Sequence, residues 1–68
     1  MQAIVNGQPM EIREGMTVSE LVETLGLAGR RIAVELNGEI VPRSRHEQQR
    51  VTAGDQLEIV HAIGGGSI

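Results

Sequence analysis

The chain has 68 residues, a net charge of -3, no cysteine and no aromatic residue. This length predicts one small domain with a thin core, built here from aliphatic side chains and methionine. The composition argues against a disulfide framework, a zinc–thiolate site and an aromatic surface for stacking bases, and the charge argues against nucleic acid and anionic membranes. The sequence shows no signal-peptide pattern and no apolar run of bilayer length, so a cytoplasmic protein is expected.

The first residues predict a hairpin. Residues 2–6 have the character of a short strand, and Asn6-Gly7 is a strong hairpin-turn signal. Residues 10–13 alternate apolar and polar side chains, as a half-buried return strand does. Glu14-Gly15 then predicts a turn before the next element.

A helix is predicted to begin after Thr17, which can cap it. Glu20, three residues on, completes the capping-box pattern Thr-x-x-Glu. Gly26 lies where a C-terminal stop is expected. One apolar stripe that faces a core is predicted at helical spacing, from Val18, Leu21, Val22 and Leu25.

The second half predicts three further strands. Residues 32–36 form a third strand, Asn37-Gly38 is a second hairpin signal, and residues 40–42 return from it. Residues 43–50 are polar and predict an irregular segment or one short helical turn. The last strand, residues 56–63, is unusually apolar, which favours a central position with a neighbour on each side.

This order of elements predicts an α+β fold of the β-grasp type, a small mixed sheet packed on one helix. One helix covering one face of the sheet is the simplest way for so short a chain to form a core. The first and last strands run parallel if they are neighbours, with the helix in the crossover. The predicted domain covers residues 1–63, and residues 64–68 form a flexible glycine tail.

Catalytic groups are scarce. His46 and His61 are far apart in sequence, and neither belongs to a triad pattern. We expect His46 to be an exposed loop residue and His61 to serve packing or the surface rather than catalysis. No metal-ligand spacing is present, so no metal or bound cofactor is expected. Asp55 is interpreted as a turn former.

Strand alternation suggests an apolar surface beside the tail. If Leu57 and Ile59 face the helix, then Ile4, Val60 and Ala62 share the open face of the sheet. Exposed apolar side chains gathered there would form a partner-binding patch. A small core on both faces of the sheet is the alternative.

The arginines form two small groups, Arg30-Arg31 and Arg43, Arg45, Arg50. Solvated surface with weak ion pairs is one interpretation of them. A docking surface for an acidic partner is the other.

Gly64, Gly65 and Gly66 end the apolar strand abruptly, and they too fit two interpretations. The first is an inert, disordered terminus. The second is a thin arm that carries a reactive carboxyl group into a partner's cleft, since glycine has no Cβ to obstruct a close approach.

Several segments together resemble one family. The chain is similar to the sulfur carrier proteins of thiamine biosynthesis, the ThiS family of ubiquitin-like β-grasp proteins. Its ending Glu-Ile-Val-His-x-x-Gly-Gly-Gly, in so short a chain, is the most specific part. The resemblance covers nearly the whole chain and rests on residues 1–7, 15–22, 33–43 and 54–66.

The resemblance implies a carrier rather than an enzyme. The Gly66 carboxylate would be adenylated with ATP by an E1-like activating enzyme, and a persulfide donor would replace AMP to leave a thiocarboxylate. Thiazole synthase would then receive the sulfur. Gly65 and Gly64 would form the rest of the working tail, and the carrier alone is expected to be a monomer without a bound cofactor.

The chain departs from the family pattern after Gly66, because Ser67 and Ile68 follow it. The Gly66 carbonyl is then part of an amide and cannot be adenylated. Either a protease removes the two residues, or they are artificial additions, or the chain is not a working carrier. Three other functions remain open: a carrier like the molybdopterin-synthase small subunit, a ubiquitin-like protein modifier, and an interaction module with an inert tail.

Overall fold

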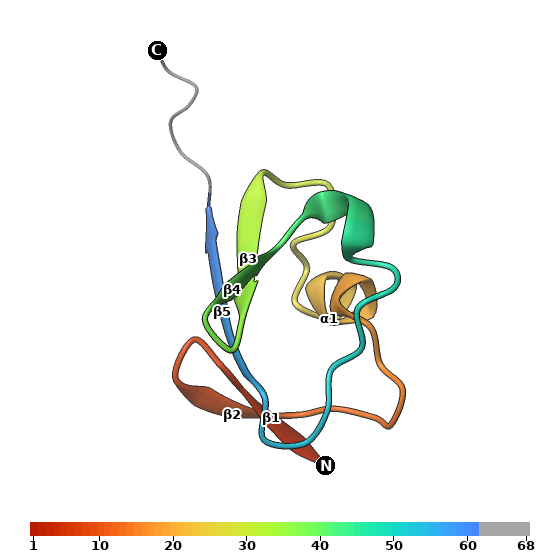
Figure 1. Cartoon of the computed structure of the whole chain (residues 1–68), viewed down its shortest axis with the longest axis vertical. Helices are drawn as coiled ribbons and strands as arrows, with labels where there is room; N and C mark the ends of the chain where they lie inside the picture. Colours follow the sequence, from red (N-terminus) through yellow and green to blue (C-terminus); the bar gives the residue numbers. More distant parts are fainter. Residues whose placement is uncertain (62–68) are drawn as a thin grey trace.

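The computed structural model describes residues 1–61 and shows five strands, one α-helix and one 3-10 turn. The sheet has the order β2-β1-β5-β3-β4, and the helix covers one of its faces (Figure 1). The predicted tail, residues 64–68, lies outside the described residues, as do the last two residues of the predicted strand 56–63. In chain order the elements are β1 (Gln2–Val5), β2 (Gln8–Glu11), α1 (Val18–Thr24), β3 (Ile32–Leu36), β4 (Glu39–Val41), η1 (Arg43–Arg45) and β5 (Gln56–His61).

Both predicted hairpin turns are confirmed. Asn6 and Gly7 have φ values of 52° and 82°, and Asn37 and Gly38 have 51° and 88°. Positive φ at both central residues is the type I′ geometry that suits the twist of a two-residue hairpin. The turn after β1 is so tight that β2 begins at Gln8, and the predicted return strand, residues 10–13, therefore starts too late.

The predicted helix start is confirmed as a complete capping box. Glu20 N–H donates to Thr17 Oγ1 at 3.2 Å, and Thr17 N–H donates to Glu20 Oε1 at 3.0 Å. The bond from Thr17 is the main reason that the pKa of the Glu20 carboxyl is lowered. Leu25 was predicted to face the core, but it is 38% exposed because the helix has already ended and Leu25 is its C-cap. Gly26 follows with φ 75°, as a stop requires.

β5 is central, as predicted. It runs parallel to β1, with Val5 beside Leu57, and antiparallel to β3, with Ile32 beside His61. Alternation along β5 places Leu57 and Ile59 in the core at 1% and 7% exposure. The other fully buried side chains come from β1, the helix, β3 and the segment before β5: Ala3, Val18, Leu21, Val34 and Val51. Over residues 1–61, no helix is long and apolar enough to cross a membrane.

Candidate functional site

The end of β5 is the point from which the glycine segment continues. His61 is the last described residue of β5 and pairs with Ile32, the first residue of β3. Loop 25–31 and the turn η1 lie at this same end of the molecule, opposite the Asn37-Gly38 turn (Figure 1). We call this region the tail end. Gly64, Gly65 and Gly66 lie outside the described residues, so their predicted role in carrying sulfur stays a prediction.

Asn6 extends the pairing of β5 beyond the point where β1 ends. Its Oδ1 accepts a hydrogen bond from Ile59 N–H at 2.8 Å, and its Nδ2 donates to Ile59 O at 3.2 Å. A side-chain amide therefore takes the place of a strand peptide group, two residues before His61. Sequence reasoning missed this contact, because the Asn-Gly signal predicts a turn without indicating where the Asn side chain bonds.

Asn37 makes a similar contact at the start of β5, on its other side. Its Oδ1 accepts from Gln56 N–H at 2.9 Å, and its Nδ2 donates to Asp55 Oδ1 at 3.1 Å. Asp55 is confirmed as a turn former, since its Oδ2 accepts from both Thr52 N–H and the Thr52 hydroxyl. Burial alone would raise the pKa of the Asp55 carboxyl, but the bonds from Thr52 and Asn37 outweigh it, and the pKa is lowered.

The open face of the sheet carries Ile4 and Val60, as the alternation predicted. Ile4 is half-buried and lies beside Gln56, while Val60 is 53% exposed and lies nearer the tail end. Glu58 stands between them along β5 and faces Glu35 across the β3 pairing. The two apolar side chains therefore share a face without forming one continuous patch. Ala62 lies outside the described residues, and the binding role of all three stays a prediction.

The prediction for His46 was wrong, because this side chain is buried at 8% exposure. Its Nε2 lies 3.0 Å from Val41 O, and its own carbonyl accepts from Ser19 N–H at 2.9 Å. The turn η1 folds the polar segment back toward the start of α1, and His46 fills the space beneath it. The surrounding polar sequence gave no sign of this burial. His46 thus joins β4 to the helix, which is a structural role.

His61 is exposed at the end of β5, in agreement with a surface role. A cleft of about 460 Å³ runs between α1 and η1, and its lining includes Glu23, Arg43, His46 and Glu47. Within residues 1–61, no group of three or more His, Cys, Asp or Glu side chains could hold a metal ion. His46 and His61 do not come together: one is buried beside β4 and the other is exposed at the end of β5.

The structure brings the two predicted arginine groups into contact. Arg43 Nη2 donates to Arg30 O at 2.9 Å across the tail end. Arg50 lies elsewhere and donates to Gly15 O at 2.9 Å. Arg45 lines a separate hollow with Glu39 and other residues of β4.

Comparison with known proteins identifies this arrangement. The model of the ThiS family matches residues 3–66, so the match includes all three glycines and ends at Gly66. The chain belongs to the ThiS family. The resemblance and the β-grasp fold predicted from the sequence are thereby confirmed.

Individual members of the ThiS family and related proteins agree with this assignment. The sulfur carrier protein ThiS of Escherichia coli is 39% identical over 66 residues, which are 97% of this chain and 100% of that protein. The crystal structure of the thiamine biosynthesis protein (ThiS) from Geobacter metallireducens superposes with a TM-score of 0.85 at 36% identity, and the match covers 97% of this chain and 100% of that one.

The ThiS-like region also occurs within larger proteins. A thiazole synthase of Paramagnetospirillum magneticum is 48% identical to this chain over 67 residues, 98% of the chain. The match spans 21% of that protein, and a second thiazole synthase, of Magnetococcus marinus, is matched over 20% of its length. The chain thus spans about a fifth of the length of these two relatives.

Proposed function

We propose that this chain is a sulfur carrier of thiamine biosynthesis, acting in the cytoplasm as a cosubstrate rather than an enzyme. The observation that carries the proposal is that the ThiS family match ends at Gly66. The fold supports it, because β5 is paired on both sides and presents the following residues at one end of the domain. The proposed reacting group is the Gly66 carboxylate, once Ser67 and Ile68 are absent.

The chemistry requires activation because a carboxylate is a poor acyl donor. A Gly66 oxygen attacks the α-phosphorus of ATP on an E1-like enzyme, and pyrophosphate leaves. The terminal sulfur of a persulfide then attacks the acyl carbon and displaces AMP. A second thiol cleaves the resulting acyl disulfide and leaves the thiocarboxylate. Glycines at 64–66 leave no Cβ to obstruct either enzyme.

Thiazole synthase is the proposed acceptor of the sulfur. Two proteins of that name contain a region similar to nearly all of this chain. Proteins that act together are often joined in one chain, which raises the effective concentration of one for the other. The same reasoning supports a direct contact between this domain and a thiazole synthase.

Intact-mass spectrometry tests the carrier function. A chain ending at Gly66 is incubated with its activating enzyme, ATP and a persulfide source. The expected result is a mass increase equal to the difference between sulfur and oxygen, whereas an unchanged mass would contradict the proposal. Gly66→Ala is expected to impair the transfer, because the added Cβ obstructs the approach. Isopeptide adducts on other proteins would indicate a protein modifier instead.

Val60 tests the proposed apolar contact on the open face. Val60→Asp is expected to weaken binding to the activating enzyme, since a charge would replace an apolar side chain that is 53% exposed. Ile40→Asp is the matched control, because Ile40 is 60% exposed on the far edge strand β4. Equal weakening by both variants would refute a localised contact at Val60.

A further inference from the structure

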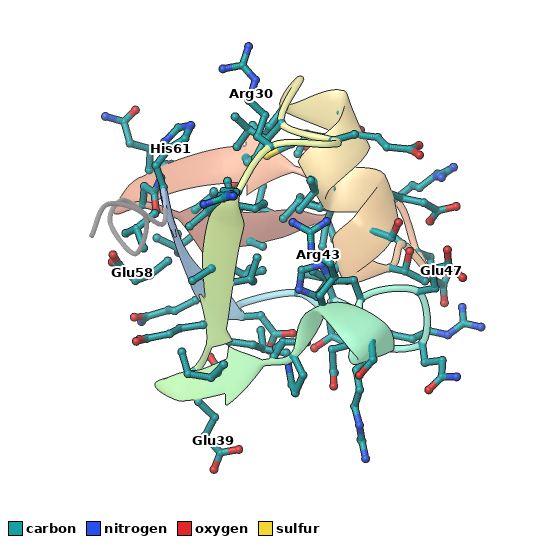
Figure 2. The ribbon with its side chains drawn as sticks, turned by 90° about the horizontal axis from the view of Figure 1, so that it is seen from above. Arg30, Glu39, Arg43, Glu47, Glu58 and His61 are labelled. Atoms are coloured by element: carbon teal, nitrogen blue, oxygen red, sulfur yellow. The ribbon has the colours of Figure 1, made fainter. Side chains whose placement is uncertain are left out.

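Three arginines lie at the end of the molecule where β5 ends, on the side of β3 and β4. Arg30 and Arg31 directly precede Ile32, which pairs with His61, so both lie next to the point where β5 ends. Arg43 begins η1 at the same end of the molecule. Figure 2 looks onto this end and shows Arg30, Arg43 and His61 distributed over it. We call Arg30, Arg31 and Arg43 the tail-end arginines.

Hydrogen bonds hold the backbone at Arg30 and the side chain of Arg43. Arg30 N–H donates to Leu27 O at 3.1 Å, which closes a turn through Gly29 at φ 82°. Arg43 Nη2 then donates to Arg30 O at 2.9 Å and links η1 to that turn. The Arg43 guanidinium is therefore held against the turn that carries Arg30 and Arg31, although the two segments are separate in the sequence.

No carboxylate neutralises these charges in the described part of the chain. The ion pairs within residues 1–61 join Met1 to Glu11 and Arg13 to Glu20. Glu23 and Glu47 line the cleft beside Arg43, but neither has an oxygen within 4.0 Å of it. All three arginines are exposed. A protein with a net charge of -3 thus keeps three positive charges at the end of β5 that have no ion-pair partner within residues 1–61.

We infer that the tail-end arginines form a docking surface for acidic side chains on the rim of the cleft that accepts the tail in the activating enzyme. This inference rests on the proposed function, because that function inserts the tail into such a cleft. A partner that binds the glycines also comes close to the tail-end arginines, because these lie at the end of the molecule where β5 ends. Guanidinium groups form paired hydrogen bonds with carboxylates, so an acidic rim is the complementary surface.

Other polyanions fit these arginines less well. Nucleic acid would meet an overall negative protein that has no aromatic side chain for stacking. Three arginines at one end also form a smaller basic area than the clusters that hold a protein on anionic lipid. An acidic protein surface needs only a few carboxylates opposite the arginines, because insertion of the tail contributes the remaining affinity.

The main effect is expected on the rate of association. Complementary charges around a binding site raise association rates by about 10-fold to 1,000-fold at low salt, and exposed pairs add little to affinity once the complex has formed. The effect fades when the Debye length shrinks to about 3 Å at 1 M salt. The signature of the arginines is therefore a salt-dependent association rate with a nearly constant dissociation rate.

Surface plasmon resonance with immobilised activating enzyme tests the inference with the 68-residue chain and the form ending at Gly66. The main variant is Arg30→Glu with Arg31→Glu, because neither side chain makes a hydrogen bond within residues 1–61. The matched single variants are Arg31→Glu and Arg45→Glu, since both side chains are exposed and unpaired there, and Arg45 lies by β4. Circular dichroism confirms that each variant is folded.

The double variant is expected to associate about 10-fold more slowly at low salt, and at the wild-type rate at high salt. Arg31→Glu should slow association about 3-fold and Arg45→Glu less than 2-fold. Equal effects of these two, or an unchanged double variant, would overturn the inference. The inference would also be overturned if the wild-type chain bound a single-stranded oligonucleotide and the double variant did not. That result would assign the arginines to nucleic acid.

Sulfur transfer separates this inference from the proposed function. If wild-type chain ending at Gly66 gains sulfur while the double variant associates normally, only the docking surface is refuted. If the wild-type chain neither associates nor gains sulfur, both proposals are refuted. At low salt and limiting enzyme, the double variant should gain sulfur more slowly than the wild-type chain, because its association is slower.

Discussion

Asn6 offers the sharpest test of how the strand before the tail is held. Its side-chain amide makes two hydrogen bonds with the backbone of Ile59, and its own φ of 52° lies in the left-handed region. Two substitutions separate these contributions. Asn6→Gly removes the hydrogen bonds and tolerates the positive φ, whereas Asn6→Ala removes the bonds and also strains the backbone.

The structure gives the expected magnitudes. Each hydrogen bond contributes about 1 kcal/mol, so Asn6→Gly should lower the free energy of unfolding by about 2 kcal/mol. Asn tolerates the left-handed region better than Ala does, which adds about 1 kcal/mol, so Asn6→Ala should lose about 3 kcal/mol. Asn37→Gly is the matched control, since Asn37 has φ 51° but its side-chain bonds are exposed. Water can replace those bonds, so a loss of at most about 1 kcal/mol is expected.

Urea unfolding followed by far-UV circular dichroism measures these losses, because the chain has no Trp or Tyr for intrinsic fluorescence. Hydrogen exchange at the Ile59 amide gives a local readout, and Asn6→Gly should accelerate it more than exchange at Val34 in β3. If Asn6→Gly and Asn37→Gly destabilise the fold equally, the hydrogen bonds between Asn6 and Ile59 contribute no more than the exposed bonds of Asn37, which refutes the prediction.

Three further predictions concern the helix, the buried histidine and acid. Thr17→Ala removes the N-terminal cap of α1 and should cost about 1 kcal/mol in thermal or urea unfolding; a change below about 0.3 kcal/mol would show that the cap is dispensable. His46→Ala should cost about 2 kcal/mol through a lost hydrogen bond and a cavity, while exposed His61→Ala should be nearly neutral; similar losses would contradict the burial of His46. The lowered pKa of Asp55 means that its carboxylate contributes stability above the unfolded pKa, and this contribution is lost as pH falls through the folded pKa. Asp55→Asn should therefore be less stable at neutral pH and lose less stability on acidification, as urea midpoints across a pH series would show; an unchanged acid slope would refute the role of Asp55.

Features encoded by neighbouring residues were predictable from the sequence. The Asn-Gly turns and the Thr17 cap depend on backbone geometry within four residues, and the structure confirms them. Alternation along β5 also placed Leu57 and Ile59 in the core correctly. The topology followed because one helix between two hairpins leaves few ways to cover a sheet.

Features that depend on distant contacts were not predictable. His46 stands in a polar run, and its burial arises only when η1 folds against the start of α1. Leu25 fits the helical stripe, yet the helix ends before it can reach the core. The contact between Arg43 and Arg30 joins residues 13 apart, and nothing in either local pattern indicates it. The glycine tail stood out from the residues alone, but the assignment of the sulfur to Gly66 came from the family resemblance and stays a prediction.

The central position of β5 has a mechanical consequence. Its hydrogen bonds to β1 and β3 lie across the strand, so a pull along the chain beyond His61 loads both ladders in shear. In shear the bonds stretch together, and because β5 is paired on both sides, two ladders rather than one carry the load. The Asn6 amide adds two bonds on the β1 side at Ile59, close to where the force enters. A partner that binds and pulls the chain beyond His61 is therefore expected to move the whole domain, without pulling β5 out of the sheet.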